Sequence, residues 1–158
     1  AYHANDPSVG FAMHKDLEVF KLYLCDTGLF VTLAFWDKNF TDNLLYQKLL
    51  NDKMSTDLGS VYENVVAQML VAEGNSLFYH TFKSETSHHN HEIDFLLSRD
   101  GKICPVEVKS STYKRHASFD AFCTKFSSRI LHKYLIYTKD LRKEKDVLYL
   151  PTYMTPFL

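Results

Sequence analysis

The residues best suited to chemistry in this sequence are two acids and a lysine, Asp94, Glu107 and Lys109. Carboxylate oxygens are the ligands that Mg²⁺ prefers, and the ion commonly takes one or two of them together with water and phosphate oxygens. An ammonium group nearby can stabilise charge on a phosphate or help to deprotonate an attacking water. Together the three residue types suggest metal-assisted hydrolysis of a phosphodiester.

A hairpin between residues 92–98 and 103–109 would bring these groups together. Asp100 and Gly101 lie between the two alternating stretches, and Asp-Gly in that position is the strongest short-range hairpin signal. If they form the turn, the register is fixed. One face is then apolar in every pair, namely Leu97 with Cys104, Phe95 with Val106, and Ile93 with Val108. Such a face must be buried, which supports the register independently of any function.

The opposite face of the hairpin pairs Asp94 with Glu107 and Glu92 with Lys109. By alternation from the turn, the two acids occupy a non-hydrogen-bonded position, where Cβ atoms lie about 4.5 to 5.5 Å apart. Like charges so placed are destabilising unless a shared proton, a basic side chain or a divalent cation offsets them. Alternatively, Lys109 simply pairs with Glu92 on the solvent face of an amphipathic strand.

Helices and further strands must surround this hairpin. The apolar spacing predicts helices over 41–51, 58–73 and 118–127, and strands over 77–82, 133–137 and 147–150. Residues 21–30 are expected to form a short buried strand and then a turn, and Gly74 ends the second helix. The order indicates an α/β fold, a mixed sheet flanked by helices, with a helical N-terminal portion over 1–57 packed on a core over 58–158 as one compact domain.

A fourth acid, Glu63, lies on the predicted helix 58–73 at the edge of its apolar face. Acids at such an edge are usually only solvated. Together with the hairpin acids, however, Glu63 becomes a candidate third ligand for the metal.

Length and composition limit the class of protein. The 158 residues suffice for one domain with a real core, and 46% hydrophobic and 23% charged residues argue against disorder. Neither a membrane span nor a signal peptide is present in the sequence, so we expect a cytoplasmic protein without a membrane partner. Cys25, Cys104 and Cys123 are expected to be reduced core thiols. The chain begins at Ala1, as after trimming or as a piece of a longer protein.

Charge is distributed unevenly along the chain. Residues 1–79 hold 5 Lys and Arg against 10 Asp and Glu, whereas residues 80–158 hold 13 against 9. A basic second half can attract a polyanion such as nucleic acid, although it can also be a solvated surface.

One further signal is weaker. His88, His89 and His91 could suggest a metal cluster, but nothing elsewhere supplies a partner set. We interpret them as part of a polar loop.

Four motifs, in order along roughly residues 20 to 150, resemble one family. They are Lys-Leu-Tyr-Leu-Cys-Asp-Thr-Gly-Leu at 21–29, Gly-Ser-Val-Tyr-Glu-Asn-Val-Val-Ala-Gln around Glu63, Glu-Ile-Asp-Phe-Leu around Asp94, and Pro-Val-Glu-Val-Lys-Ser-Ser around Glu107 and Lys109. This set resembles the domain, often described as of unknown function, that follows the nucleotide-binding part of many prokaryotic AAA-type ATPases. The chain has no Walker A pattern, so the resemblance implies a detached tail of such an ATPase.

The resemblance implies a restriction-endonuclease-like fold with the PD-(D/E)XK signature on Asp94, Glu107 and Lys109, and the helix acid on Glu63. Ile93 stands where that signature has its proline. In that superfamily the strand carboxylates bind Mg²⁺, for which Mn²⁺ can substitute, the lysine assists hydrolysis, and the helix acid supports the metal. The partners implied are nucleic acid, DNA foremost, and the ATPase domain of the same parent chain. Some relatives only bind, so an inactive binding or regulatory module for DNA, a protein or its own ATPase is the alternative.

Overall fold

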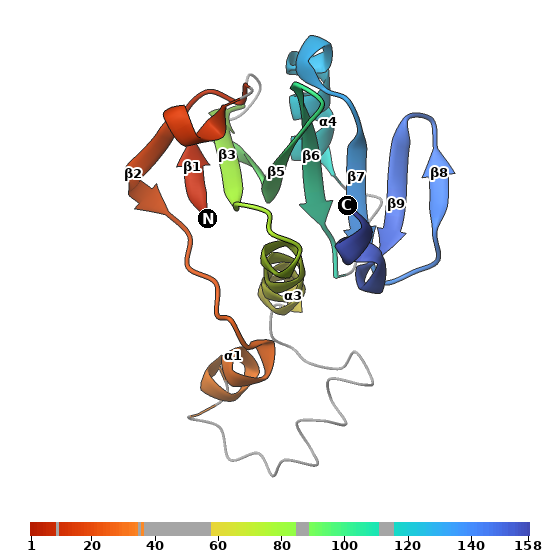
Figure 1. The fold of residues 1–158 in the computed structure, drawn as a ribbon. Coiled ribbons are helices and arrows are strands. Elements are labelled where there is room, and N and C mark those ends of the chain that lie inside the picture. Colours follow the sequence, from red (N-terminus) through yellow and green to blue (C-terminus); the bar gives the residue numbers. More distant parts are fainter. Residues whose placement is uncertain (9, 35, 37–57, 85–88, 111–115) are drawn as a thin grey trace.

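The computed structural model of the chain describes residues 1–8, 10–34, 36, 58–84, 89–110 and 116–158. Its helices and strands are shown in Figure 1. In chain order they are β1 (Tyr2–Ala4), η1 (Phe11–Met13), β2 (Lys15–Phe20), α1 (Thr27–Ala34), α3 (Leu58–Ala72), β3 (Phe78–Lys83), β4 (Asn90–Ile93), β5 (Phe95–Arg99), β6 (Lys102–Val108), α4 (Ala117–Lys125), η2 (Ser127–Arg129), β7 (Lys133–Tyr137), β8 (Arg142–Glu144), β9 (Val147–Pro151) and η3 (Thr152–Phe157).

The strands form two mixed sheets. One has the order β2-β1-β3-β4 and the other the order β5-β6-β7-β9-β8. Strand pairs β1–β3, β6–β7 and β7–β9 are parallel, and the remaining neighbours are antiparallel. The predicted α/β class is confirmed, with two mixed sheets in place of the single one expected.

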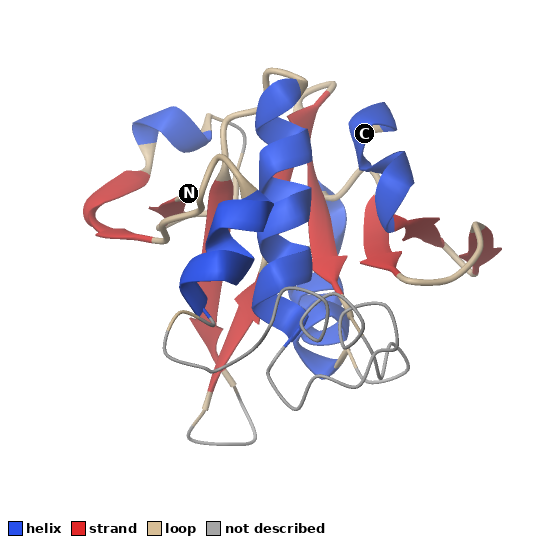
Figure 2. Cartoon of the chain, turned by 90° about the horizontal axis from the view of Figure 1, so that it is seen from below, coloured by secondary structure: helices blue, strands red, loops and turns tan. Residues whose placement is uncertain are grey.

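Helices α3 and α4 bury opposite faces of the β5–β6 hairpin. Leu70 of α3 packs in one cluster with Phe95, and Phe122 of α4 packs in another with Leu96. Successive strand residues point to opposite faces, so Phe95 and Leu96 face different helices. Viewed from below, α3 lies across the strands with α1 beside it (Figure 2). The hairpin is therefore apolar on both faces, as is typical of strands held between helices.

The predicted helix 58–73 is confirmed as α3. It ends at Ala72, two residues before Gly74, whose φ of 80° lies in the left-handed region that favours glycine. The backbone N–H of Asn75 then donates to the Leu70 carbonyl at 3.0 Å, which satisfies an orphan carbonyl of the last turn. Glu63 consequently lies on a well-terminated helix, packed on the sheet.

The prediction for residues 1–57 is incomplete. Besides α1, the described part of this range contains the strands β1 and β2, and β1 pairs with β3 of the core. These strands are short, and β2 is largely exposed, so neither shows the strong apolar alternation that predicts a strand. The helix predicted over 41–51 lies outside the described residues.

The prediction of a buried strand and turn over 21–30 is wrong. The segment is at most half-buried, and helix α1 begins at Thr27. Asp26 caps this helix, because its carboxylate accepts the Leu29 backbone N–H at 2.9 Å and its carbonyl accepts that of Phe30 at 3.0 Å. An N-capping aspartate was the missed signal.

The predictions for the second half of the chain agree better with the structure. The helix over 118–127 and the strands over 133–137 and 147–150 are confirmed as α4, β7 and β9, within two residues at each end. The exposed three-residue strand β8 was not expected. No helix in the described part of the chain is long and apolar enough to span a membrane.

Two predictions about polar side chains need correction. Cys104 and Cys123 are buried free thiols as predicted, but Cys25 is exposed. Burial raises the pKa of Cys123 to about 12, so this thiol stays protonated at neutral pH. His91 belongs to strand β4 and not to a loop, because its strand pairs with β3, and its Nδ1 lies 3.0 Å from Ser118 Oγ. His88 lies outside the described residues.

Candidate metal centre

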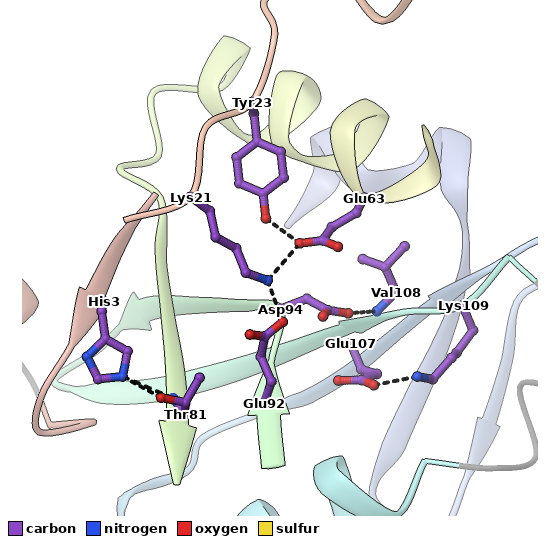
Figure 3. Close-up of polar contacts among 10 residues, drawn as sticks. All are labelled: His3, Lys21, Tyr23, Glu63, Thr81, Glu92, Asp94, Glu107, Val108 and Lys109. Atoms are coloured by element: carbon purple, nitrogen blue, oxygen red, sulfur yellow. Dashed lines mark hydrogen bonds and ion pairs between the residues drawn. The ribbon is translucent and has the colours of Figure 1, made fainter. Parts of the chain in front are cut away.

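Four carboxylates and two ammonium groups meet at the end of the β5–β6 hairpin that lies away from the turn (Figure 3). They come from separate parts of the chain: Glu63 from α3, Glu92 from β4, Asp94 from between β4 and β5, Glu107 from β6, Lys21 from the loop before α1, and Lys109 from directly after β6. Residues far apart in the sequence thus share one electrostatic environment, in which the acids raise the pKa of the two lysines, and Glu63 and Glu107 raise that of Asp94.

Asp94 lies where the chain passes from one sheet to the other. The hairpin ladder ends at Phe95 and Val106, and the preceding residue Ile93 pairs instead with His80 of β3. In a continued ladder the Val108 N–H would donate to the Ile93 carbonyl. In this structure it donates to Asp94 Oδ2 at 2.7 Å. The carboxylate thereby replaces a backbone partner and is fixed at the strand switch.

This environment raises the pKa of Asp94 well above the ordinary aspartate value. The main cause is desolvation by burial, followed by the negative charges of Glu107 and Glu63. The hydrogen bond from Val108 and the charge of Lys21 act in the opposite direction but are weaker. The ionised form of Asp94 is therefore unfavourable, because the nearby hydrogen bond and positive charge do not outweigh its burial and the neighbouring negative charges.

Glu107 is almost completely buried, with 3% of its surface exposed. Its Oε1 pairs with Lys109 Nζ at 2.7 Å, whereas its buried Oε2 has no hydrogen-bond partner among the described residues. Burial raises the pKa of Glu107, although the Lys109 ammonium opposes this rise. Burial alone would lower the pKa of Lys109, but the Glu107 charge and hydrogen bond outweigh it and raise that pKa. An unpartnered buried carboxylate oxygen is costly unless a proton, a water molecule or a ligand satisfies it.

Glu63 reaches the centre from α3 and is held by two groups of the N-terminal segment. Its Oε1 accepts hydrogen bonds from Lys21 Nζ at 3.2 Å and from the Tyr23 hydroxyl. Lys21 Nζ also pairs with Glu92. Burial raises the pKa of Tyr23, and the Glu63 hydrogen bond raises it further, so the phenol remains a donor.

The hairpin register is confirmed from Arg99 opposite Lys102 as far as Phe95 opposite Val106. Beyond that point the predicted cross-strand pairs are wrong. Asp94 and Glu107 are not ladder partners, although the negative charge of Glu107 still helps to raise the pKa of Asp94. The suggested pairing of Glu92 with Lys109 is also wrong, because Glu92 contacts Lys21 and Lys109 contacts Glu107. The strand switch at Asp94 is the cause of both differences.

One known family covers most of this centre. A family model described as "Domain of unknown function (DUF4143)" matches residues 58–153, which is more than half of the chain. The chain belongs to this DUF4143 family. Searches of curated proteins and of solved structures found no match.

Five of the site residues lie inside the range of the DUF4143 match, namely Glu63, Glu92, Asp94, Glu107 and Lys109, and all of them except Glu92 were predicted from the sequence as site residues. Lys21 and Tyr23 lie outside this range and were missed. Their spacing carried a usable signal. In an extended segment residues two apart point to the same side, so a lysine and a tyrosine in Lys-Leu-Tyr could act on one target.

The donor chemistry of this DUF4143 centre fits a divalent cation. Its four carboxylates face two ammonium groups, so full ionisation leaves an excess of two negative charges, which one divalent cation would neutralise. Carboxylates suit Mg²⁺ and Mn²⁺, and the free oxygen of Glu107 could serve as a ligand. As they stand, however, no three His, Cys, Asp or Glu side chains in the described ranges cluster tightly enough to hold a metal. The acids are paired with ammonium groups and with backbone instead.

Proposed function

We propose that this DUF4143 domain hydrolyses phosphodiester bonds in nucleic acid with the help of Mg²⁺ or Mn²⁺. The observation that carries the proposal is the unpartnered, buried Oε2 of Glu107 beside Asp94 and Lys109. A structural ion pair would satisfy both oxygens of so buried a carboxylate. The order of the motifs supports the same reading, since they resemble the PD-(D/E)XK signature.

Each residue has a separate role in this proposal. Asp94 and Glu107 would hold the cation, and Glu63 would support it from α3. A bound divalent cation would lower the pKa of a water and polarise the phosphate. Lys109 is 28% exposed, so its ammonium could contact the substrate phosphate on the open side of the centre. There it could stabilise the charge that develops on phosphorus oxygens or orient the attacking water.

The distribution of charge along the chain suggests the class of substrate. The second half of the chain, which includes Lys109, carries the excess of Lys and Arg, and a nucleic-acid backbone is the polyanion that such a surface would attract. We propose DNA as the first substrate to test. The resemblance further suggests that this domain works beside an ATPase domain in its parent chain.

Incubating the purified chain with single- and double-stranded oligonucleotides in Mg²⁺ or Mn²⁺ tests the proposal. We expect cleavage that EDTA abolishes. Glu107→Gln and Lys109→Met should each lower the cleavage rate by at least about 100-fold, because each removes a group proposed to act in the reaction. Glu18→Gln, an acid-to-amide change on the exposed strand β2, is the matched control and should cleave normally. Undiminished cleavage by Asp94→Asn would remove the mechanism.

A binding or regulatory module is the second candidate, and one observation favours it. Lys21 and Lys109 already provide counter-charges to the acids, so the fold can persist without a metal. This candidate predicts that oligonucleotide affinity, measured by fluorescence anisotropy, falls as salt is raised. It also predicts that no cleavage accompanies binding at any metal concentration.

A further inference from the structure

We propose that the Lys21 ammonium is a resident cation of this centre, which a divalent metal ion displaces when it binds the acids. The inference rests on the proposed metal-dependent function and deepens it. It assigns control of metal binding to a residue outside the range of the family match. Two cations of different kinds would thus compete for one set of carboxylates.

The contacts of Lys21 support this role. Its Nζ lies 3.2 Å from Glu63 Oε1 and also pairs with Glu92, so one ammonium bridges an acid of α3 and an acid of β4. Its charge also acts on Asp94, which lies between these two elements and the hairpin (Figure 3). Lys21 therefore occupies the part of the centre where a metal that Asp94 helps to hold and Glu63 supports would have to lie.

The two lysines of the centre differ in the acids they contact. Among the described residues Lys109 forms an ion pair with one acid, Glu107, and leaves the second oxygen of that carboxylate unpartnered. Lys21 instead joins two acids from different elements. A cation that bridges several acids competes with a metal more directly than one that pairs with a single oxygen. Lys21, and not Lys109, is therefore the competitor.

The side chain of Lys21 can leave without a change of fold. Its backbone is fixed beside Ala1 by two hydrogen bonds, Lys21 N to Ala1 O and Ala1 N to Lys21 O, both of 2.8 Å. Its side chain is 25% exposed, and a lysine stem has four rotatable carbons, so the ammonium can turn towards solvent. In its present position Nζ also lies 5.0 Å from the centroid of the Tyr79 ring, which offers the ammonium a favourable cation contact.

A purely structural role predicts the opposite effect on metal binding. If Lys21 served only to hold Glu63 in place, its removal would disorder a ligand and weaken metal binding, as loss of a supporting contact usually does by about 10- to 100-fold. If Lys21 competes with the metal, its removal takes away a repulsive charge and strengthens binding. The sign of the change in affinity therefore separates the two roles.

The experiment compares Mn²⁺ affinities of the metal-free native chain, Lys21→Met and Lys21→Gln by isothermal titration calorimetry. Both variants should bind Mn²⁺ at least about tenfold more tightly, because each removes one positive charge close to the bound ion. Lys102→Met removes the same charge at the turn end of the hairpin and should leave the affinity unchanged. Asp94→Asn should abolish binding and so locates the ion. Circular dichroism verifies folding, and Lys21→Gln is decisive if Lys21→Met does not fold.

The outcomes distinguish this inference from the proposed function. Tighter binding by the Lys21 variants supports it, and so does binding that appears only in those variants. Equal or weaker binding by the variants, with clear binding by the native chain, overturns the inference and leaves the metal-dependent function intact. Absence of Mn²⁺ binding in every form, Lys21 variants included, overturns both.

Discussion

The two ends of the β5–β6 hairpin follow different rules. At the turn end, Asp100 and Gly101 have φ values of 48° and 73°, as a type I′ turn requires, and the register runs without interruption. At the other end the ladder stops at Phe95, and Asp94 accepts a backbone hydrogen bond with its side chain. Local backbone preferences thus determine the structure of the turn end, whereas the end that carries Asp94 departs from regular strand pairing.

The difference shows what the irregular end accomplishes. A continued ladder would have placed Asp94 and Glu107 directly opposite each other, with Glu92 on the same face. The switch into β4 moves Glu92 to a position where it meets Lys21, while Val108 holds the Asp94 carboxylate beside Glu107. The chain gives up regular strand pairing at this point, and one acid of the centre, Glu92, comes from the second sheet. Departures from local rules are expected at sites kept for function.

Breaking the regular end should cost the most stability. Leu97 is 3% exposed and packs in the cluster under α3, so Leu97→Ala leaves a cavity and should lower the free energy of unfolding by about 2 to 5 kcal/mol. Urea denaturation measures this change. Leu141→Ala, the same truncation at a side chain that is 51% exposed, is the control and should cost less than about 0.5 kcal/mol. If Leu97→Ala lowered the free energy of unfolding no more than Leu141→Ala does, the hairpin would not be part of the core.

A smaller effect is expected at the turn. A side chain at Gly101 meets no atom within 4 Å, so any cost arises from the positive φ of 73°. Gly101→Val should therefore lower the free energy of unfolding by about 1 to 2 kcal/mol. Gly101→Asn should cost less, because asparagine tolerates this conformation. If urea denaturation showed equal losses of unfolding free energy for the two variants, the positive φ at Gly101 would not be the source of the cost.

The sequence predicts the turn end of the hairpin better than the end that carries Asp94. The turn at Asp100 and Gly101, the register beside it and the helix carrying Glu63 all follow from short-range preferences and apolar spacing, and all are present. The break at Asp94 could not be predicted, because it depends on β3 competing for the strand that ends at Ile93. Lys21 was missed for a similar reason, since its contacts with Glu63 and Glu92 span 42 and 71 residues of chain.

The smallest expected change tests the acid end of the hairpin, which is the end that carries Asp94 and Glu107. Because the pKa of Asp94 is raised in the folded chain, the folded state binds its proton more tightly than the unfolded state does. The free energy of unfolding must then fall as pH rises from about 4, the unfolded value, through the raised folded value. Asp94→Asn keeps an oxygen for the Val108 N–H but removes the charge. It should raise the metal-free stability at neutral pH by about 1 kcal/mol and flatten this pH dependence.

The matched control for that change lies at the other end of the same hairpin. Asp100→Asn is also an acid-to-amide substitution, and asparagine before Gly101 suits a type I′ turn as well as aspartate does. Asp100 is exposed, so its charge costs little, and the variant should unfold like the native chain at every pH. Urea denaturation across pH 4 to 8 in EDTA compares the three proteins. If Asp94→Asn were as pH-dependent as the native chain, or less stable at neutral pH, the acid end would be an ordinary satisfied ion-pair network and the contrast between the two ends would disappear.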